Sequence, residues 1–187
     1  MKLKNYEFKA RANDLERLEQ KLLELDPVFN GEDHQIDTYF NVASGRLKLR
    51  EGNIENALIY YERPDTANAK QSSIILYKHQ PDISLKEILS RVNGIKVVVE
   101  KLRKIYFIGN VKFHFDTVTE LGTFVEVEAI DDTGQINVEE LQKQCNLYFS
   151  FFGLEENDYI SKSYSDLILE KSGNQIRIKE IQNTKSK

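Results

Sequence analysis

The feature that most limits how this chain can fold is an alternation of apolar and polar residues in short runs. In residues 122–130, Val125, Val127 and Ala129 alternate with Glu126 and Glu128. Because successive side chains of a β-strand point to opposite faces of a sheet, this pattern predicts a strand with one apolar and one acidic face. Comparable runs predict eight strands, at about 3–11, 36–42, 46–52, 56–63, 73–79, 96–108, 111–118 and 122–130.

Turns and helix boundaries complete the predicted order of elements. Turn-like segments at 41–45, 51–55 and 109–110 favour antiparallel hairpins between neighbouring strands. Polar caps followed three residues later by glutamate predict three helices, which begin near Asn13, Ser84 and Asn137. The first helix should cover about 13–25, and the other two should end at Gly94 and Gly153. A fourth helix is expected at about 157–171, so the predicted class is α+β.

The charged faces of the predicted strands are sorted by sign. Cations concentrate in residues 46–50 and 100–104, whereas carboxylates concentrate in residues 114–118 and 124–129. An ordinary antiparallel sheet with a solvated charged face explains any one strand, but such a face has no need to sort its charges. If the eight strands close into a barrel with helices outside, the charged face becomes an interior that is wide enough for one small ligand.

Such an interior would need a ligand that compensates its charges. Inward-facing lysines and arginines suit a polyanion, because arginine binds phosphate in a bidentate manner and lysine acts as a point charge. Clustered carboxylates, without a cysteine or a histidine pair at ligand spacing, suit a hard cation such as Mg²⁺ or Mn²⁺. A divalent metal ion together with a polyphosphate would satisfy both sets.

Composition indicates the number of domains, the classes of partner and the cellular compartment. The chain has 187 residues, of which 40% are hydrophobic, and this is sufficient for one globular domain with a substantial core. The net charge of -4 disfavours a general role in coating nucleic acid or membrane surfaces. The single cysteine, Cys145, is interpreted as a packing residue, and the sequence shows no signal segment or long apolar run. We therefore expect a cytoplasmic domain at 1–171, followed by a polar, mobile tail at 172–187.

Several short motifs, in their order along the chain, resemble the CYTH family of class IV adenylyl cyclases and thiamine triphosphatases, within the triphosphate tunnel metalloenzymes. That family has Glu-x-Glu-x-Lys in its first strand, and the matching stretch here is residues 5–9, with Asn5 in place of the first glutamate. The other matches are Asp37-Thr38-Tyr39-Phe40, Arg46-Leu47-Lys48-Leu49-Arg50, Tyr61-Glu62-Arg63, Lys78, Lys101-Leu102-Arg103, His114-Phe115-Asp116 and Glu126-Val127-Glu128. The resemblance covers about residues 3–170 and implies a closed eight-stranded antiparallel β-barrel, the triphosphate tunnel, with helices packed on the outside.

The resemblance also implies a role for each matching side chain. The metal ligands, for Mg²⁺ or Mn²⁺, would be Glu7, Asp116, Glu126 and Glu128. The phosphate ligands would be Lys9, Arg46, Lys48, Arg50, Arg63, Lys78, Lys101 and Arg103. The catalytic residues would be Glu7, Lys9, Asp116 and Glu128. Because Asn5 brings no charge, a second metal ion would be held less tightly than in the family pattern.

Three functions are compatible with these residues. The preferred one is a class IV adenylyl cyclase-like conversion of ATP to cyclic AMP and pyrophosphate, because residues 111–129 most resemble that branch. The alternatives are hydrolysis of thiamine triphosphate or inorganic tripolyphosphate, and nonenzymatic sensing of a triphosphate. No nucleic-acid or membrane partner is expected. The aromatic residues at 148–152 should pack against the barrel, and their excess could also cover a subunit interface in a homodimer.

Overall fold

The computed structural model of the protein describes residues 2–62 and 70–173. Arg63 and most of the predicted tail therefore lie outside the described residues. The strands are β1 (Lys2–Arg11), β2 (Val28–Phe40), β3 (Arg46–Glu51), β4 (Ala57–Glu62), β5 (Lys70–Lys78), β6 (Ile95–Ile108), β7 (Val111–Val118) and β8 (Gly122–Asp131). The helices are α1 (Leu15–Leu23), α2 (Ile83–Asn93), α3 (Val138–Phe152) and the short 3₁₀ helix η1 (Glu156–Asp158), followed by a helical segment at 164–173.

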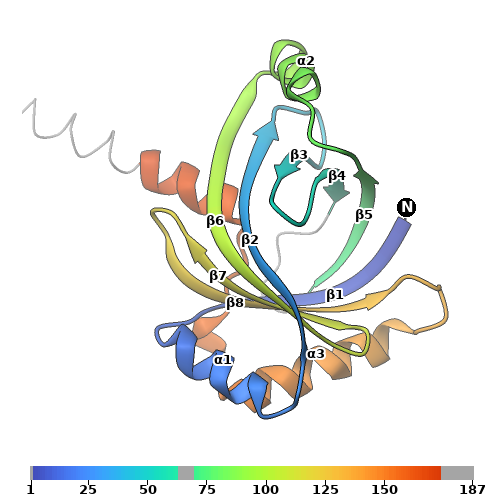
Figure 1. The fold of residues 1–187 in the computed structure, drawn as a ribbon, viewed down its shortest axis with the longest axis vertical. Helices are drawn as coiled ribbons and strands as arrows, with labels where there is room; N and C mark the ends of the chain where they lie inside the picture. The colour runs from blue at the N-terminus through green and yellow to red at the C-terminus, as the bar shows by residue number, and fades with distance from the viewer. Residues whose placement is uncertain (1, 63–69, 174–187) are drawn as a thin grey trace, which may run out of the picture.

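The eight strands form a closed ring, in the order β1-β5-β4-β3-β2-β6-β7-β8 and back to β1 (Figure 1). Every neighbouring pair is antiparallel. The N-terminal strand closes the ring, since β1 pairs with β5 on one side and with β8 on the other. The predicted antiparallel barrel with helices outside is therefore confirmed.

The largest difference from the predicted strands is the start of β2, which begins at Val28 rather than at residue 36. Residues 28–35 include an Asn-Gly pair and no clear alternation, which argues against a strand from sequence alone. In the structure they pair along β6, and a β-bulge between Phe29 and Gly31 absorbs the irregularity. Gly31 has a φ of 127°, a conformation that side-chain-bearing residues rarely adopt. Pairing with β6 thus extends a strand that its own sequence does not predict.

Helix boundaries agree with the predictions to within a few residues. Asn137 caps α3 as predicted, but the cap of α1 is Asp14 and that of α2 is Asp82. Both aspartates accept a hydrogen bond from a backbone amide of the first turn, which is the usual reason for aspartate at this position. Gly94 and Gly153 end the second and third helices, each with a positive φ.

The predicted fourth helix is interrupted. Its first part is η1, and its second part begins only at residue 164. Between them, Tyr159 forms a β-bridge with Ala10, and the amide of Ile160 donates to the carbonyl of Lys9 at 2.8 Å. These contacts with β1 hold the chain extended, and Ser163 with Asp166 then caps the next helical turn. The interruption attaches the C-terminal segment to the rim of the barrel.

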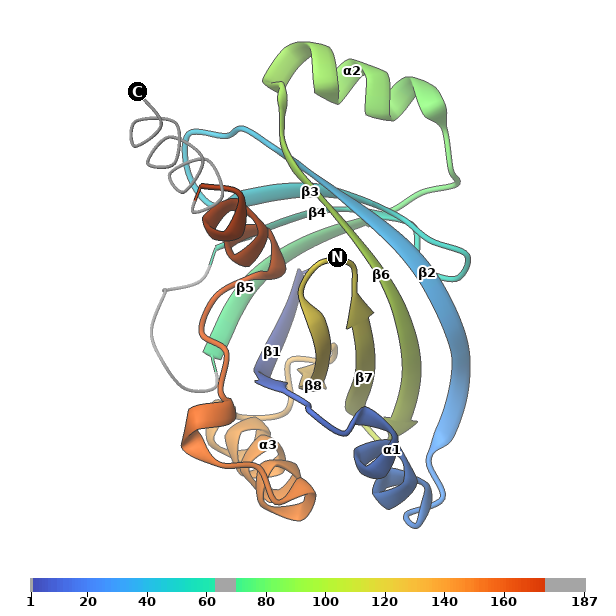
Figure 2. The same cartoon turned by 90° about the vertical axis from the view of Figure 1, so that its left-hand side faces the viewer.

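The main hydrophobic core lies outside the barrel, between the strands and the helices α1 and α3. Both views place these two helices on one side of the molecule and α2 on the opposite side (Figures 1 and 2). Phe113 packs edge to face against Tyr148 at a ring separation of 4.6 Å, and Phe8 packs in the same way against Phe149 at 5.4 Å. The aromatic residues of α3 therefore pack on the barrel as predicted, while the homodimer stays a prediction.

Two further observations concern the thiol of Cys145 and the character of the described helices. Cys145 is fully buried in this outer core, and burial raises the pKa of its thiol to about 12. Such a thiol stays protonated and packs as a small apolar group, in agreement with its predicted role. None of the described helices combines the length and the apolar character that crossing a membrane requires.

Candidate active site

The interior of the barrel encloses a cavity of about 580 Å³. Its volume is within the range of about 300–1,000 Å³ that is typical of small-molecule sites. The predicted site residues that line it are Glu7, Lys9, Lys48, Arg50, Lys78, Lys101, Arg103, Glu126 and Glu128. Strands far apart in the sequence thus bring most of the predicted cations and carboxylates to one enclosed space. Arg46 and Asp116 do not line this cavity, and Arg63 is outside the described residues.

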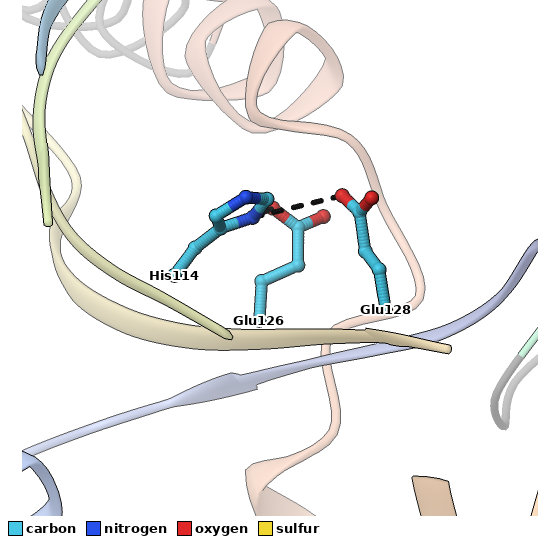
Figure 3. Close-up of side chains that lie close together, drawn as sticks. All are labelled: His114, Glu126 and Glu128. Carbon is cyan, nitrogen blue, oxygen red and sulfur yellow. Dashed lines mark ion pairs between the residues drawn. The ribbon is translucent and has the colours of Figure 1, made fainter. Parts of the chain in front are cut away.

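One side of the cavity holds a compact group formed by His114, Glu126 and Glu128 (Figure 3). Their ligand atoms all lie within 4.8 Å of one another. His114 Nδ1 is 3.5 Å from a carboxylate oxygen of Glu126 and 3.6 Å from one of Glu128. These residues come from the adjacent strands β7 and β8, where His114 is the direct partner of Glu126 in the register. The alternation of both strands turns all three side chains inward.

Burial and like charge give this group unusual protonation. Burial, together with the neighbouring carboxylates Glu126 and Glu7, raises the pKa of Glu128 to about 7. Burial, together with the positive charges of Arg103 and Lys112, lowers the pKa of His114 to about 3. His114 is therefore a neutral imidazole near pH 7, and neither of its ring nitrogens has a hydrogen-bond partner. A neutral imidazole offers one ring nitrogen as an acceptor or ligand.

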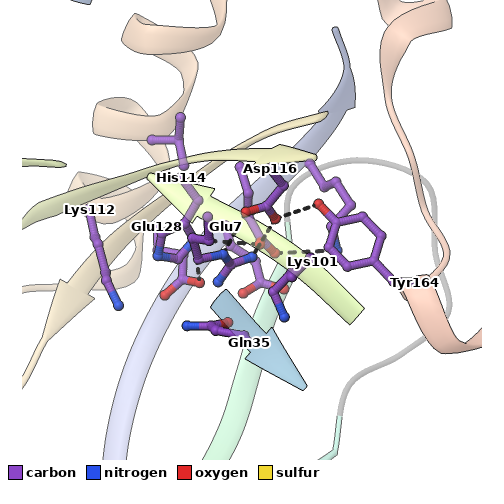
Figure 4. Close-up of polar contacts among 12 residues, drawn as sticks. Glu7, Gln35, Lys101, Lys112, His114, Asp116, Glu128 and Tyr164 are labelled. Carbon is purple, nitrogen blue, oxygen red and sulfur yellow. Dashed lines mark hydrogen bonds and ion pairs between the residues drawn. The ribbon is translucent and has the colours of Figure 1, made fainter. Parts of the chain in front are cut away.

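Behind this group, Arg103 joins Asp116 to Glu126. Its guanidinium donates to Asp116 at 2.6 and 2.5 Å and to Glu126 at 2.7 Å. Tyr164 donates its hydroxyl to the same Asp116 at 2.8 Å, and Figure 4 shows the phenol ring beside that carboxylate. Burial alone would raise the pKa of Asp116. The positive charge of Arg103 and its hydrogen bonds act in the opposite direction, and the pKa of this carboxyl lies below its usual value. The structure thus gives Asp116 three donated hydrogen bonds, and its predicted role as a metal ligand stays a prediction.

Asp37 is a second centre of charge, for which the sequence predicted no role. It accepts hydrogen bonds from Lys48 at 3.0 Å, from Arg50 at 2.8 and 3.1 Å, and from Lys101 at 2.8 Å. Burial raises its pKa, but the three cations lower it well below the usual range of a carboxyl group. Three of the predicted phosphate ligands therefore converge on one carboxylate. Its inward position in the strand could be read from the alternation, whereas this convergence could not.

A loop between β3 and β4, residues 52–56, reaches across one end of the cavity. The side chain of Glu55 accepts from Arg50 at 2.9 Å and forms a short ion pair with Lys112 of β7. Asp33 of β2 holds the loop by accepting from the backbone amides of Ile54 at 2.9 Å and Glu55 at 3.0 Å. Sequence reasoning missed Glu55, because a glutamate in a turn gives no periodic signal. The alternation does put Lys112 on the same face as His114, but Lys112 was not among the predicted site residues.

The first strand places its polar residues as predicted. Asn5, Glu7 and Lys9 all line the cavity. Asn5 donates to Glu7 at 3.1 Å, while its own side-chain oxygen is buried without a hydrogen-bond partner. Lys9 lies 3.3 Å from Glu126 and 4.2 Å from the ring centre of Tyr164. The position that departs from the family pattern is thus at the cavity wall, with a polar oxygen available.

Arg46 does not line the cavity, where a phosphate ligand would lie. Its guanidinium pairs with Asp166 of the C-terminal helical segment at 2.9 Å. Tyr164 and Ser163 of the same segment line the cavity, so this segment covers one end of the barrel. We therefore interpret Arg46 as a residue that fastens the segment, a role that its position in a cationic run does not indicate.

The residues of the cavity fit a hard divalent cation. Glu126 and Glu128 supply carboxylate oxygens, and these are ligands that Mg²⁺ and Mn²⁺ prefer. The buried oxygen of Asn5 and the ring nitrogens of His114 have no hydrogen-bond partners, and such orphaned polar atoms call for a ligand. Counting only the described residues, the cavity is lined by seven lysines and arginines against five carboxylates, so an anion is favoured beside the cation.

Comparisons with known proteins find solved structures that share the fold. A protein from Pyrococcus horikoshii OT3 shares 29% identity at a TM-score of 0.77, over 87% of this chain and 98% of its own. A protein from Vibrio parahaemolyticus that is proposed to be an adenylate cyclase shares 17% identity and the fold, at a TM-score of 0.70 over 88% and 97% of the two chains.

A third solved structure, of a proposed adenylyl cyclase from Hippeastrum with a dominant triphosphatase activity, shares 12% identity and the fold, at a TM-score of 0.58 over 92% and 96% of the two chains. The search of curated proteins gives no match. The sequence pattern of the CYTH domain matches residues 3–164, most of the chain. The protein therefore belongs to the CYTH family.

Proposed function

We propose that the protein is a divalent-metal-dependent enzyme that converts ATP to cyclic AMP and pyrophosphate, as class IV adenylyl cyclases do. The observation that carries this proposal is the cavity itself. It combines a group of metal-ligand residues, His114, Glu126 and Glu128, with an excess of lysines and arginines inside one enclosed barrel. A triphosphate chain with its metal ion is the small ligand that complements both sets.

In this proposal the side chains divide into two roles. His114, Glu126 and Glu128 would hold the metal ion, which would polarise a phosphate oxygen and lower the pKa of the attacking hydroxyl. Arg50, Lys101 and the other cavity cations would bind the triphosphate and stabilise the charge that develops on the leaving pyrophosphate. Arg103 is held by Asp116 and Glu126, so its charge is already oriented when the substrate enters.

A second candidate function is hydrolysis of the triphosphate. The same residues would then activate a water molecule, which attacks the terminal phosphorus and releases phosphate. The Hippeastrum protein shares the fold and carries a dominant triphosphatase activity, which is the specific observation that favours this candidate. In this hydrolysis the remainder of the chain leaves as a diphosphate, whereas in cyclisation the α-phosphorus is attacked and pyrophosphate leaves. Both reactions need positive charge beside the phosphate oxygens.

The test is an incubation of the protein with ATP, thiamine triphosphate and inorganic tripolyphosphate, each with Mg²⁺ or Mn²⁺, followed by identification of the products. We expect cyclic AMP and pyrophosphate from ATP. Release of phosphate instead would support the hydrolase, and binding without any product would support a sensor. A protein that neither binds nor converts any of the three compounds would contradict the proposal, and Glu128→Gln should abolish metal-dependent turnover.

A further inference from the structure

The wall of the cavity formed by β4 and β5 is mainly apolar where its side chains are described, at residues 57–62 and 74–78. Ile59 and Tyr61 of β4 and Ile74 and Leu76 of β5 all line the cavity. The register pairs Ile59 with Leu76 and Tyr61 with Ile74, so these four side chains form one continuous patch. Within residues 57–62 and 74–78, the parts of the two strands whose side chains are described, Lys78 at the end of β5 is the only charged residue that lines the cavity.

This patch faces the charged wall across the barrel. In the ring of eight strands β4 lies four places from β7, and β5 lies four places from β6. Figure 1 shows β5 on the side of the barrel opposite β6. The facing strands contribute Lys101, Arg103, Lys112 and His114 to the cavity. The apolar patch therefore faces charged strands, and its neighbours β1 and β3 also bring charged side chains to the cavity.

An inorganic polyphosphate would use only the charged strands of the cavity and not the apolar patch. Its strongly hydrated oxygens gain nothing from an aliphatic surface and lose hydrogen bonds to water if they are pressed against it. Apolar surface that lines a binding site is favourable when an apolar part of the ligand covers it. The patch therefore suits a ligand with an organic group attached to its phosphate chain.

The charge on this wall also limits which organic group fits. A cationic group, such as the thiazolium ring of thiamine, would need a carboxylate or an aromatic face free of competing cations. Lys78 would instead repel it. An uncharged, planar group that packs flat against Ile59, Ile74 and Leu76 meets no such penalty, and nucleoside bases have this character.

We propose that the β4–β5 wall binds the base and sugar of a nucleoside triphosphate and selects against inorganic tripolyphosphate and thiamine triphosphate. This inference rests on the proposed function, because the phosphate chain must lie against the charged wall. Ile59 and Leu76, at the middle of the patch, are then specificity-determining residues. They act on the organic group and leave recognition of the phosphate chain to the opposite wall.

The test compares ATP with tripolyphosphate, titrated calorimetrically into the full chain with excess EDTA so that no metal-dependent turnover occurs. Tripolyphosphate carries the higher negative charge, so charge alone predicts that it binds more tightly. We expect the reverse order, with thiamine triphosphate weaker than ATP. Leu76→Asn should weaken ATP binding roughly 10-fold, as expected for the loss of one apolar contact, and should leave tripolyphosphate binding unchanged.

A matched control lies next along the same strand. Ile75 points outward and is 49% exposed, so Ile75→Asn should change neither affinity. If Leu76→Asn fails to fold by circular dichroism, Leu76→Ala makes the same comparison. The inference is overturned if wild-type protein binds ATP no more tightly than tripolyphosphate, if thiamine triphosphate binds more tightly than ATP, or if both affinities fall together in the variant. Failure of all three ligands to bind, both in EDTA and with Mg²⁺ present, would overturn the proposed function as well.

Discussion

At the scale of single residues, the cations of the cavity are held by the protein's own carboxylates. Asp37 binds Lys48, Arg50 and Lys101, and it is 1% exposed. Breaking a buried ion pair by removing one partner is strongly destabilising, because the remaining charge is left uncompensated. We therefore expect Asp37 to stabilise the free protein by neutralising these three cations before a phosphate chain binds to them.

This leads to a prediction for Asp37→Asn, which keeps the shape of the side chain and removes its charge. The free energy of unfolding should fall by about 3 kcal/mol, since Lys48 and Lys101 lose their counterion and Arg50 keeps only Glu55 among its described partners. Tripolyphosphate should raise the midpoint of thermal unfolding more in the variant than in the wild type, because it replaces the missing charge. Glu100→Gln serves as the control, since Glu100 pairs with His34 at an exposed position and should matter little. Equal effects of the two substitutions would contradict the role of Asp37.

The buried amine of Lys101 leads us to predict that the affinity for a triphosphate depends on pH. Burial, with Arg50 and Arg103 nearby, lowers its pKa to about 7 even though Asp37 opposes the change. Below pH 7 the free protein carries this charge, and above pH 7 the amine loses its proton, so triphosphate binding must restore the proton there. Affinity for tripolyphosphate should therefore fall as the pH rises from 7 to 9, with proton uptake on binding measured by calorimetry in two buffers.

The control for this prediction is Lys101→Arg, because a guanidinium stays charged throughout this range. Protonation of tripolyphosphate itself contributes equally to both proteins and cancels in the comparison. Wild-type protein and variant should therefore differ in slope above pH 7. Identical pH profiles for the two proteins would show that Lys101 does not titrate in this range.

The position of Asn5 leads us to predict that a carboxylate in its place would raise the affinity for a metal ion. Its buried oxygen lies at the cavity wall, and its neighbour Glu7 pairs with Glu128 in the register of β1 and β8. Asn5→Glu should tighten binding of Mn²⁺, since each added carboxylate strengthens a site for a hard cation. Asn53→Glu adds the same charge elsewhere on the cavity lining and should have a smaller effect. Unchanged affinity in a folded Asn5→Glu variant would show that Asn5 is not beside the metal ion.

At the scale of elements, the loop of residues 52–56 competes with the ligand. Glu55 occupies Arg50 and Lys112, two cations of the cavity. Glu55→Gln should therefore tighten tripolyphosphate binding several-fold, because the ligand no longer displaces an internal carboxylate. Glu51→Gln is the matched control, since Glu51 pairs with Lys86 of α2 instead. Weaker binding by Glu55→Gln would show that this glutamate positions the cations for the ligand.

At the scale of the whole molecule, the sequence predicts which side chains share a face better than which strands are neighbours. The period-two alternation correctly predicted that the side chains of Glu7, Lys101 and Glu126 point into the same interior. It could not predict that β1 lies between β5 and β8, because pairing across long separations leaves no local pattern. Glu55 was missed because it lies in a turn without periodicity, and its pairing with Lys112, 57 positions away, leaves no local pattern either.

The position of β1 in the ring also has a consequence for synthesis of the chain. Ala12 and Thr123, which bond where β1 meets β8, are 111 positions apart. At typical rates of translation, the ribosome needs on the order of 10 s to make the intervening chain. During that interval an edge of β1 has no partner from β8, and unpaired strand edges are prone to aggregate. The edge of β1 that pairs with β8 is therefore covered only after β8 has emerged from the ribosome and the ring can close.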